Sequence, residues 1–399
     1  MNRPQLLDDV VVLDLTTIVS GGTATSLLAD FGARVIKLEH PKGGDPLRAW
    51  GPSKDGVSLW WKVISRNKQS ATLNLKDLRG QELLKRLVER ADVLVENFRP
   101  GILEQWNLGY DVLSDVNPRL VMVRISGFGQ TGPYRDRPGF GTVAESMSGL
   151  VAITGHPDGP PVLPPLPLAD EIAGLFGAMS TLMALHFRDR RGAKGQVIDI
   201  SLYEPLFRLL IPHIPQYTLL GDRPQRVGNR FPGAAPRNLY QTAEGEWLAL
   251  SATTQRVFER LAQTMGRVDL LSDHRFADNE SRVAHVDALD AIVQEWTGSR
   301  PLDDLLQTLE DAGAVAGPVY DVPRILADRQ YEAREDVIRV ADHDLGEIPM
   351  PAVIPKFSHT PGHVAHAGPR LGEHNETIYG GLLGLAPDQL TRLAHEGVI

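Results

Sequence analysis

Asp170 is the residue whose surroundings in the sequence best fit a chemical role. It follows residues 155–167, which contain six prolines and are therefore expected to form an extended connector. A helix is predicted to begin at residue 169, so Asp170 would lie in its first turn, where free amides keep a carboxylate ionised. Such a carboxylate serves either as a helix cap or as a covalent nucleophile, and the adjacent Glu171 is the rival candidate.

The predicted helix that contains Asp170 carries small residues on nearly one face. Because small side chains let helices lie close together, another backbone is expected to approach this face. The residues concerned are Ala173, Gly174, Gly177 and Ala178.

Lys76 and the run Asn97-Phe98-Arg99 lie in loops that follow predicted strands. Cationic side chains and main-chain amides in such loops could hold phosphates. The alternative interpretation is a pair of solvated loops with one buried Phe. The residues alone leave both interpretations open.

Gly21 and Gly22 lie between the first predicted strand and helix, and Glu39 ends the next strand. This order imitates the dinucleotide-binding fingerprint, in which an acidic residue binds a ribose hydroxyl. The full G-x-G-x-x-G pattern is missing, however. A tight turn with close helix–strand packing is therefore the alternative interpretation.

The sequence gives no support for a metal or thiol site. It has no cysteine, which excludes disulfides, thiolate zinc sites, iron–sulfur clusters and a cysteine nucleophile. Its 12 histidines are scattered, and His359, His363 and His366 lie in a loop rather than on one helical face. We therefore expect no metal.

Composition limits the class of partner. The 41 Lys and Arg against 50 Asp and Glu give a net charge of −9, which argues against nucleic acid. No apolar run reaches the ~20 residues of a membrane span, and two aspartates interrupt the first ten residues, where a secretory signal would be apolar. We expect a cytoplasmic protein with no membrane partner.

The elements that must position these residues alternate between strand and helix over the first two hundred residues. Such alternation predicts an α/β fold with a parallel sheet. Strands are predicted at residues 10–15, 35–39, 70–75, 93–95, 120–125 and 197–201, and helices at 23–31, 80–90 and from 169. Ligands of such sheets bind at the carboxyl ends of the strands.

The 399 residues are enough for roughly two or three domains. A linker is expected near residues 222–237, followed by a smaller α+β domain with a strand at 247–251 and helices at 255–265 and 286–296. The last part returns to strands at 315–320 and 348–355 and a helix at 387–395.

Taken in order, eight segments resemble the family III CoA-transferases, which include formyl-CoA transferase and carnitine CoA-transferase and share their fold with the α-methylacyl-CoA racemases. The similarity runs nearly end to end. The segments are GARVIKLEHPKGGDPLR (32–48), RNKQSATLNLK (66–76), ADVLVENFRPG (91–101), ISGFGQTGPYRDRPGF (125–140), LADEIAG (168–174), GAKGQVIDISLYE (192–204), AGPVYDVPRILAD (316–328) and LGEHN (371–375).

The resemblance implies that Asp170, rather than Glu171, is the nucleophile. It would attack an acyl-CoA thioester, form a mixed anhydride and then carry CoA as an aspartyl thioester, which an acceptor acid would take over. Coenzyme A and a small carboxylic acid are thus the implied ligands. The family's CoA contacts correspond to Val19, Ser20, Leu73, Lys76, Asn97, Phe98, Arg99 and Arg137.

Departures from the pattern narrow the implied substrates. Formyl-CoA transferase has a glutamine where this chain has Val19 and an arginine where it has Gln105, which argues against formyl or oxalyl groups. Its glycine-rich lid loop has no counterpart here. Racemases need a histidine at the position of Phe140, which cannot carry a proton. The motif PGFG instead resembles transferase branches of the family that use succinyl-CoA and dicarboxylic acids.

The family also implies an architecture. Residues 1–221 would form a Rossmann-like CoA-binding domain, residues 222–330 the smaller domain, and residues 331–399 would return to the large one. Two ring-like subunits would interlock into a homodimer. The alternatives are an acyl-CoA racemase or epimerase, an NAD(P)-dependent oxidoreductase, and a CoA-binding protein without turnover.

Overall fold

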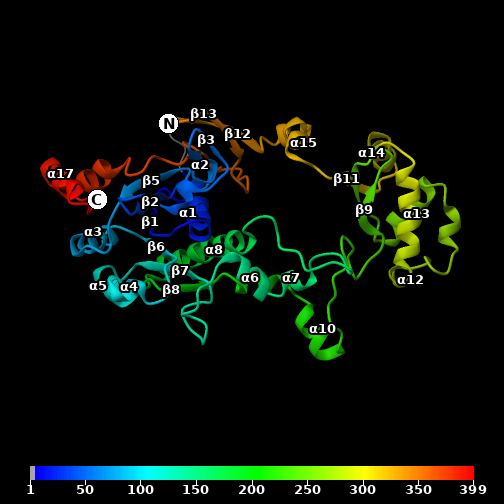
Figure 1. Ribbon diagram of the computed structural model, residues 1–399, viewed down its shortest axis with the longest axis horizontal. Helices are drawn as coiled ribbons and strands as arrows, with labels where there is room; N and C mark the ends of the chain where they lie inside the picture. The colour runs from blue at the N-terminus through cyan, green and yellow to red at the C-terminus, as the bar shows by residue number, and fades with distance from the viewer. Residues whose placement is uncertain (1–4) are drawn as a thin grey trace. The chain divides into compact units, whose positions relative to one another are not determined.

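A parallel sheet of six strands forms the frame of the structure, a computed structural model that describes residues 5–399 (Figure 1). Its strands are β1 (Val11–Asp14), β2 (Arg34–Glu39), β5 (Lys68–Thr72), β6 (Val93–Glu96), β7 (Val121–Ser126) and β8 (Val197–Ser201). They lie in the order β5-β2-β1-β6-β7-β8, and every neighbouring pair is parallel. The predicted α/β class with a parallel sheet is confirmed.

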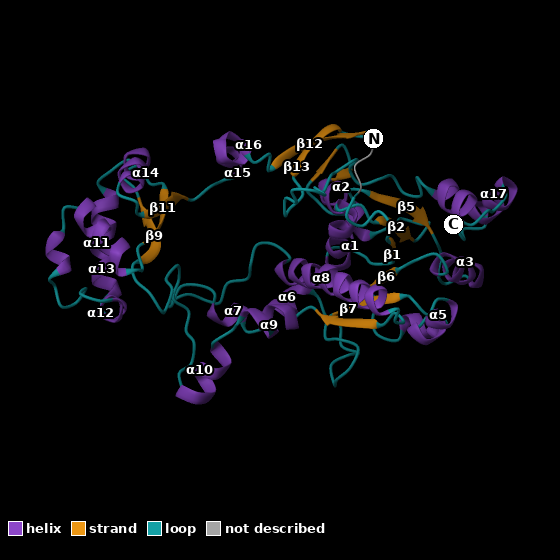
Figure 2. Ribbon diagram, turned by 180° about the vertical axis from the view of Figure 1, so that it is seen from behind, coloured by secondary structure: helices purple, strands orange, loops and turns teal. Residues whose placement is uncertain are grey.

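Helices cover both faces of this sheet, because successive strand residues point to opposite sides. Val12 and Val35 belong to one buried cluster, with α1 (Ser20–Asp30) and α8 (Leu168–Arg191). Their neighbours along the strands belong to a second cluster, with α3 and α5 on the other face (Figure 2). These two helices span Leu78–Val88 and Tyr110–Val116. Two-sided burial explains the apolar runs of β1, β6 and β7, whereas β5 contains the buried polar residues Lys68 and Ser70.

The predicted close approach to the small-residue face of α8 is confirmed. A Cβ atom added to Gly174 would lie 2.7 Å from the carbonyl oxygen of Ser20, and one on Gly177 would lie 3.2 Å from Cβ of Ala24. Helix α8 is long and apolar enough to cross a membrane by length and composition. Its packing against α1 and the sheet is that of a core helix of an α/β unit.

The strand order reverses beside β1. From β1 the chain runs outward to β2 and β5, and it then returns to place β6 on the opposite side of β1. Loops that leave the carboxyl ends of β1 and β6 therefore diverge, which opens a crevice at this point of the sheet edge.

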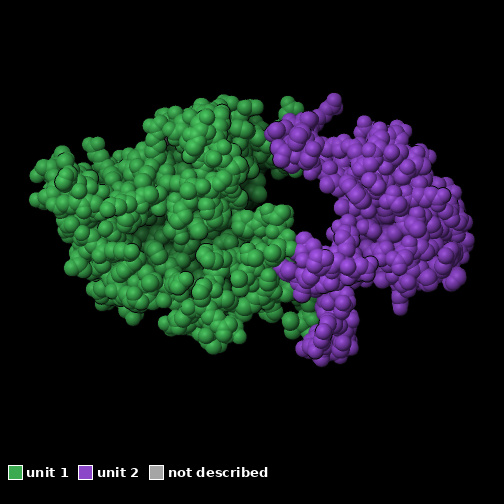
Figure 3. All heavy atoms as spheres, in the orientation of Figure 1, with its two compact units in different colours: residues 1–150, 163–214, 330–399 green, residues 151–162, 215–329 purple. Residues whose placement is uncertain are grey.

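The described chain divides into two compact units, which Figure 3 shows in different colours. The first contains residues up to 150, residues 163–214 and residues 330–399, and the second contains residues 151–162 and 215–329. The predicted domain boundaries at 221 and 330 stay a prediction, and residues 1–4 of the first predicted domain lie outside the described residues.

The second unit has its own core around an antiparallel sheet in the order β11-β10-β9. Its elements are β9 (Arg237–Gln241), β10 (Trp247–Ser251), β11 (Val315–Pro318), α10 (His213–Leu220), α11 (Gln255–Thr264), η2 (Val268–Leu271), α12 (Asn279–Ala284), α13 (Val286–Gly298), α14 (Leu302–Asp311) and α15 (Val322–Ala327), of which α10 begins in the first unit.

The remaining elements are short and lie outside the two larger sheets. They are η1 (Pro46–Ala49), β3 (Ser53–Lys54), β4 (Val57–Ser58), α2 (Leu59–Ile64), α4 (Ile102–Gln105), α6 (Gly141–Met147), α7 (Leu150–Ile153), α9 (Glu204–Leu209), α16 (Arg329–Ala333), β12 (Val337–Asp342), β13 (Gly346–Pro351), the π-helix Glu376–Leu382 and α17 (Pro387–His395).

Candidate active site

A cavity of about 490 Å³ lies in the first unit at the crevice beside β1. Its walls come from the loops after β1, β6 and β7, the start of α6, the proline-rich connector and the first turn of α8. Three of the predicted site residues line it, namely Ser20, Asn97 and Asp170. The topology thus gathers residues that are up to 150 positions apart in the sequence.

Asp170 lies in the first turn of α8, as the sequence predicts, but it is not the helix cap. The N-cap position belongs to Pro167, which has no side chain to bond to the helix amides. The Asp170 carboxylate instead faces the first residue of α6. A Cβ atom added to Gly141 would lie 2.3 Å from Oδ2 of Asp170, so only glycine leaves room for the carboxylate there.

Burial raises the pKa of Asp170 from 3.8 to about 6, and the negative charges of Glu145 and Glu171 add to this rise. The main-chain amide of Asp170 and then the Ser20 hydroxyl act in the opposite direction and lower the pKa. A carboxylate with a pKa near 6 is still mostly ionised at neutral pH. It is also more basic than an ordinary aspartate, which favours attack on a carbonyl group.

The two rival acids at the start of α8 differ in their surroundings. Glu171 accepts a hydrogen bond of 3.0 Å from the Thr23 hydroxyl and does not line the cavity. Asp170 does line it. This difference supports Asp170 as the reactive acid, because a nucleophile must be open to its substrate.

Glu145 is a site residue to which the sequence assigned no role. It lies on α6, is only 3% exposed, lines the cavity and accepts a 3.3 Å hydrogen bond from the amide of Ala169. The cavity thus contains two carboxylates, and none of its lining residues, all within the described part of the chain, is Lys, Arg or His. The uncompensated negative charge of Glu145 adds to the effect of burial in raising the pKa of Asp170.

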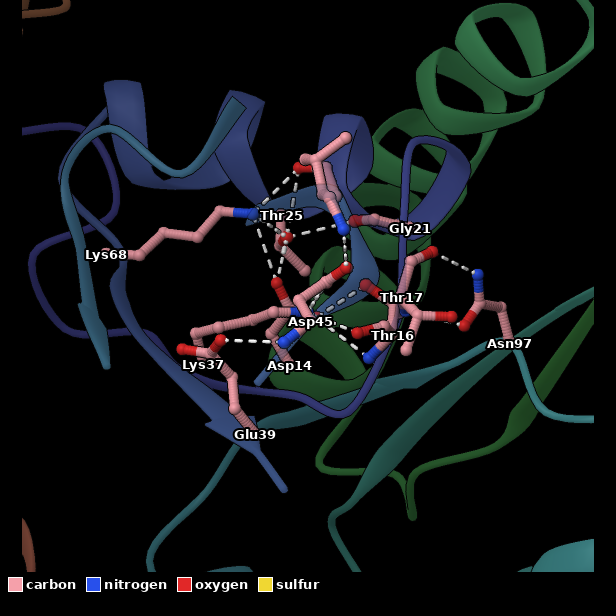
Figure 4. A network of polar contacts seen from close by, with 12 residues as sticks. Asp14, Thr16, Thr17, Gly21, Thr25, Lys37, Glu39, Asp45, Lys68 and Asn97 are labelled. Carbon is pink, nitrogen blue, oxygen red and sulfur yellow. Dashed lines mark hydrogen bonds and ion pairs between the residues drawn. The ribbon is translucent and has the colours of Figure 1, made fainter. Parts of the chain in front are cut away.

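The loop after β1 forms one wall of the cavity and is fixed by reciprocal hydrogen bonds. The amide of Thr17 donates to Oδ1 of Asn97, and Nδ2 of Asn97 donates to the carbonyl of Thr17, both at 2.8 Å (Figure 4). Asn97 therefore joins the two loops that diverge at the strand reversal. Its predicted role in holding CoA is not tested by this contact.

Beneath that loop lies a network of buried charges (Figure 4). The parallel register pairs Asp14 with Lys37, whose Nζ is 3.4 Å from one Asp14 oxygen and 3.0 Å from Oδ2 of Asp45. Lys68 lies 3.1 Å from the other Asp14 oxygen. Burial alone would raise the pKa of Asp14, but the two lysines hold it well below its ordinary value.

A second cavity, of about 210 Å³, lies beside the first. The predicted residues Leu73, Lys76 and Phe98 line it, and apolar side chains such as Trp106 form part of its wall. Thr17 lines both cavities. A long ligand with a flat ring at one end could therefore extend from the second cavity into the first.

Three other predicted contacts do not line either cavity. The Val19 side chain is 1% exposed and packs in a small core cluster beside the loop. Arg99 and Arg137 are exposed, and the Arg137 guanidinium stacks 3.6 Å from the ring centre of Tyr134. Their predicted contacts with CoA stay predictions.

Sequence reasoning also missed site residues that only the fold brings together. Gly141 and Trp50 line the first cavity, and Asp45 anchors the loop after β1. The signal for Gly141 lies in the PGFG motif, from which we draw a substrate class and the absence of a histidine but no role for this glycine. Asp45 lies in a polar loop, and its position in the sequence relative to other polar residues does not indicate a role at the site.

The glycines of the first turn have a packing role. A Cβ atom on Gly21 would lie 2.1 Å from the Thr16 side chain, and one on Gly22 would lie 2.8 Å from Ile64. Both oxygens of Glu39 accept hydrogen bonds from Arg48, at 2.7 and 2.8 Å. Glu39 is therefore engaged internally and does not offer a free carboxylate to a ribose.

Comparisons with known proteins agree on one family. The family described as CoA-transferase family III matches residues 7–375. Succinyl-CoA–D-citramalate CoA-transferase of Chloroflexus aurantiacus is 47% identical over 99% of this chain and 98% of the relative. Succinate–glutarate CoA-transferase of Agrobacterium fabrum is 35% identical over 94% of this chain and 96% of the relative. The crystal structure of a CaiB/BaiF family protein from Brucella suis matches with a TM-score of 0.85 and 34% identity, over 96% of this chain and all of that one.

Proposed function

The chain belongs to CoA-transferase family III, and on this premise we propose that it moves CoA from succinyl-CoA to a free dicarboxylic acid through a thioester on Asp170. The observation that carries the proposal is the Asp170 carboxylate, which lines a cavity free of cationic side chains and has a pKa of about 6. Relatives named for succinyl-CoA and for succinate and glutarate support the substrate class.

The proposed reaction consists of four acyl transfers. An Asp170 oxygen attacks the thioester carbonyl, the C–S bond breaks, and a mixed anhydride and CoA thiolate form. The thiolate attacks the aspartyl carbonyl, so that the donor acid leaves and aspartyl-CoA remains. The acceptor carboxylate then attacks the carbonyl of aspartyl-CoA, the C–S bond breaks, and a second anhydride and free CoA thiolate form. Attack by the thiolate on the acceptor carbonyl releases the new acyl-CoA and frees Asp170. No proton or electron is gained or lost overall.

Each intermediate is an activated acyl group that water would destroy. The proline-rich connector and the glycines Gly127 and Gly139 form close walls around Asp170. A Cβ atom on Gly127 would lie 2.8 Å from Cα of Gly139, so two backbone segments pack directly against each other there. Such walls limit the room for water beside the reacting atoms.

We place the nucleotide end of CoA in the second cavity and the thioester in the first, with the pantetheine chain passing Thr17. The Phe98 ring and Trp106 offer apolar surface to the adenine, and Lys76 offers a cation to phosphate. A racemase needs a proton carrier opposite Asp170, and Phe140 at the cavity wall cannot be one.

The proposal is tested by a panel of acyl-CoA donors against carboxylic acids, with CoA products identified by mass spectrometry. Exchange between succinyl-CoA and dicarboxylic acids is the expected result. Wild-type protein incubated with the active donor and then treated with hydroxylamine or borohydride should carry the modification on Asp170. Modification of Glu171 instead, or deuterium exchange at the α-carbon without any acceptor, would overturn the assignment.

We also propose that a second copy of the chain covers the outer face of α8. Large apolar side chains recur there at helical spacing and are 43–61% exposed, namely Leu175, Met179, Met183 and Phe187. Light scattering should therefore report a dimer for the wild type. Met183→Glu with Phe187→Glu should shift the mass toward a monomer, whereas an unchanged mass would contradict this surface as the interface.

A further inference from the structure

Ile18, in the loop between β1 and α1, has an unusual backbone conformation. Its φ is 64°, in the left-handed region, which is sterically unfavourable for a β-branched residue. Ile18 also lines the first cavity, beside Thr17 and Ser20. A strained residue at a cavity wall persists only where its surroundings hold it in place.

The contacts that hold this loop come from three separate parts of the chain. Each of three consecutive amides donates to a side chain, and Figure 4 shows the groups together. The bonds are Thr16 to Asp14 Oδ1 at 3.0 Å, Thr17 to Asn97 Oδ1 at 2.8 Å, and Ile18 to Asp45 Oδ1 at 3.0 Å. The strained peptide itself is therefore held by Asp45.

Asp45 is fixed from both sides, so it can hold the strained amide firmly. It is 4% exposed and caps η1, where its Oδ1 also accepts the amide of Leu47 at 2.9 Å. Its Oδ2 pairs with the buried Lys37 at 3.0 Å. The amide of Asp45 donates to Glu39 at 3.0 Å. Its carboxylate thus has two fixed oxygens, one for the loop and one for the lysine.

Ser20, two residues beyond Ile18, begins α1 and lines the first cavity together with Asp170, and its hydroxyl lowers the pKa of that carboxyl. We propose that Asp45 is a positioning residue that holds Ile18 in its left-handed conformation and thereby sets Ser20 against Asp170. This inference rests on the proposed role of Asp170 as nucleophile. It adds a residue that influences Asp170 through the backbone of the loop between β1 and α1.

Asp45→Asn is the first test. The substitution preserves shape, but an amide nitrogen cannot pair with Lys37, so the side chain rotates or shifts and loses its hold on Ile18. We expect kcat to fall about tenfold, as for the loss of one hydrogen bond to a charged group. Ser20→Ala should have the same effect. Glu145 and Glu171, which also face Asp170, are unaltered in both variants.

The pH profile separates positioning from general destabilisation. Ser20 lowers the pKa of Asp170, and the reaction requires the ionised carboxylate. Asp45→Asn and Ser20→Ala should therefore both move the acid limb of kcat/KM to higher pH. A profile that keeps its position in either variant would overturn the proposal.

Ile18→Gly supplies the decisive comparison, because glycine adopts a positive φ without steric cost. Its own effect on KM is measured first, since Ile18 lines the cavity. In the Ile18→Gly background, Asp45→Asn should lower kcat less than twofold. An equal loss in both backgrounds would mean that Asp45 does not act through Ile18.

Asp30→Asn is the matched control. Asp30 is 1% exposed, lies at the far end of α1 and pairs with Arg66 at 2.6 Å, so its loss also breaks a buried ion pair. We expect a lower melting temperature with an unchanged pH profile. If the wild type forms no adduct on Asp170, the proposed function is contradicted. If the wild type forms the adduct but Asp45→Asn behaves like Asp30→Asn, only this inference is contradicted.

Discussion

Two aspartates of the first unit, Asp14 and Asp170, are both withdrawn from water but are surrounded by opposite charges. Asp14 is fully buried between Lys37 and Lys68, which hold its pKa well below 3.8. Asp170 has the acid Glu145 nearby, and its pKa rises to about 6. Burial acts to raise the pKa of both carboxyl groups. The neighbouring charges then decide whether the pKa ends above or below its ordinary value.

The difference separates a structural carboxylate from the one that we propose to be reactive. At Asp14 each oxygen has a cation and a hydroxyl partner, so the group stabilises the fold and is unavailable for chemistry. At Asp170 no cation compensates the charge. The protein thus accepts a destabilised carboxylate at the cavity, where its higher basicity is useful.

The largest expected effect is on activity. Asp170→Ala should lower CoA transfer by at least about a thousandfold, since it removes the group that we propose to form the covalent intermediate. Initial rates with the best donor–acceptor pair measure the loss. CoA binding, followed by calorimetry, should be retained. Substantial turnover in this variant would contradict the contrast between Asp14 and Asp170, because Asp170 would then not be the nucleophile.

The next effect is on stability. Asp14→Asn leaves Lys68 buried without its carboxylate and should lower the free energy of unfolding by about 3–5 kcal/mol. Denaturant titration at neutral pH measures it. Asp14 stabilises the fold above its unfolded pKa, and this stabilisation is lost as pH falls through its lower folded pKa.

The exposed pair Arg339–Glu347 offers a control for Asp14. Its charged atoms lie 3.1 Å apart and both side chains are more than half exposed. Glu347→Gln should change the free energy of unfolding by less than about 1 kcal/mol. If Asp14→Asn cost no more than this control, the buried network would not be a source of stability.

Asp170→Asn should raise the free energy of unfolding, whereas Asp14→Asn should lower it. Because the folded state raises the pKa of Asp170 from 3.8 to about 6, its ionised form destabilises the fold at higher pH. Neutral Asn should add roughly 1–2 kcal/mol at about pH 8. The gain should disappear as pH falls from 6 toward 3.8, measured by denaturant titration over that range. A loss of stability at about pH 8 would contradict the contrast with Asp14.

The smallest effect is a shift in the pH profile. Glu145→Gln removes a negative charge beside Asp170, so the pKa of Asp170 should fall and the acid limb of kcat/KM should move to lower pH. Glu171→Gln, whose charge contributes less, should move it less in the same direction. A limb that moves upward in either variant would reverse the electrostatic account of the cavity.

Much of the frame could be predicted because it depends on local patterns. The strand at residues 197–201 and the helix at 387–395 match the structure residue for residue. The strand predicted at 70–75 is instead Lys68–Thr72, since Lys68 and Ser70 are polar residues buried by contacts that no local pattern reveals. The short helix Gly141–Met147, which carries Glu145, was missed because its apolar residues show no clear period.

The order of strands and helices along the chain, the place of Asp170 in the first turn of a helix and the resemblance to a CoA-transferase family are all contained in the sequence, since each depends on neighbours along the chain. The tertiary structure alone decides which charges surround each buried carboxylate. Lys68 approaches Asp14 across 54 residues, and Glu145 reaches the first turn of α8 from another helix. Electrostatic energy depends on distance in space, and spacing along the chain does not determine that distance.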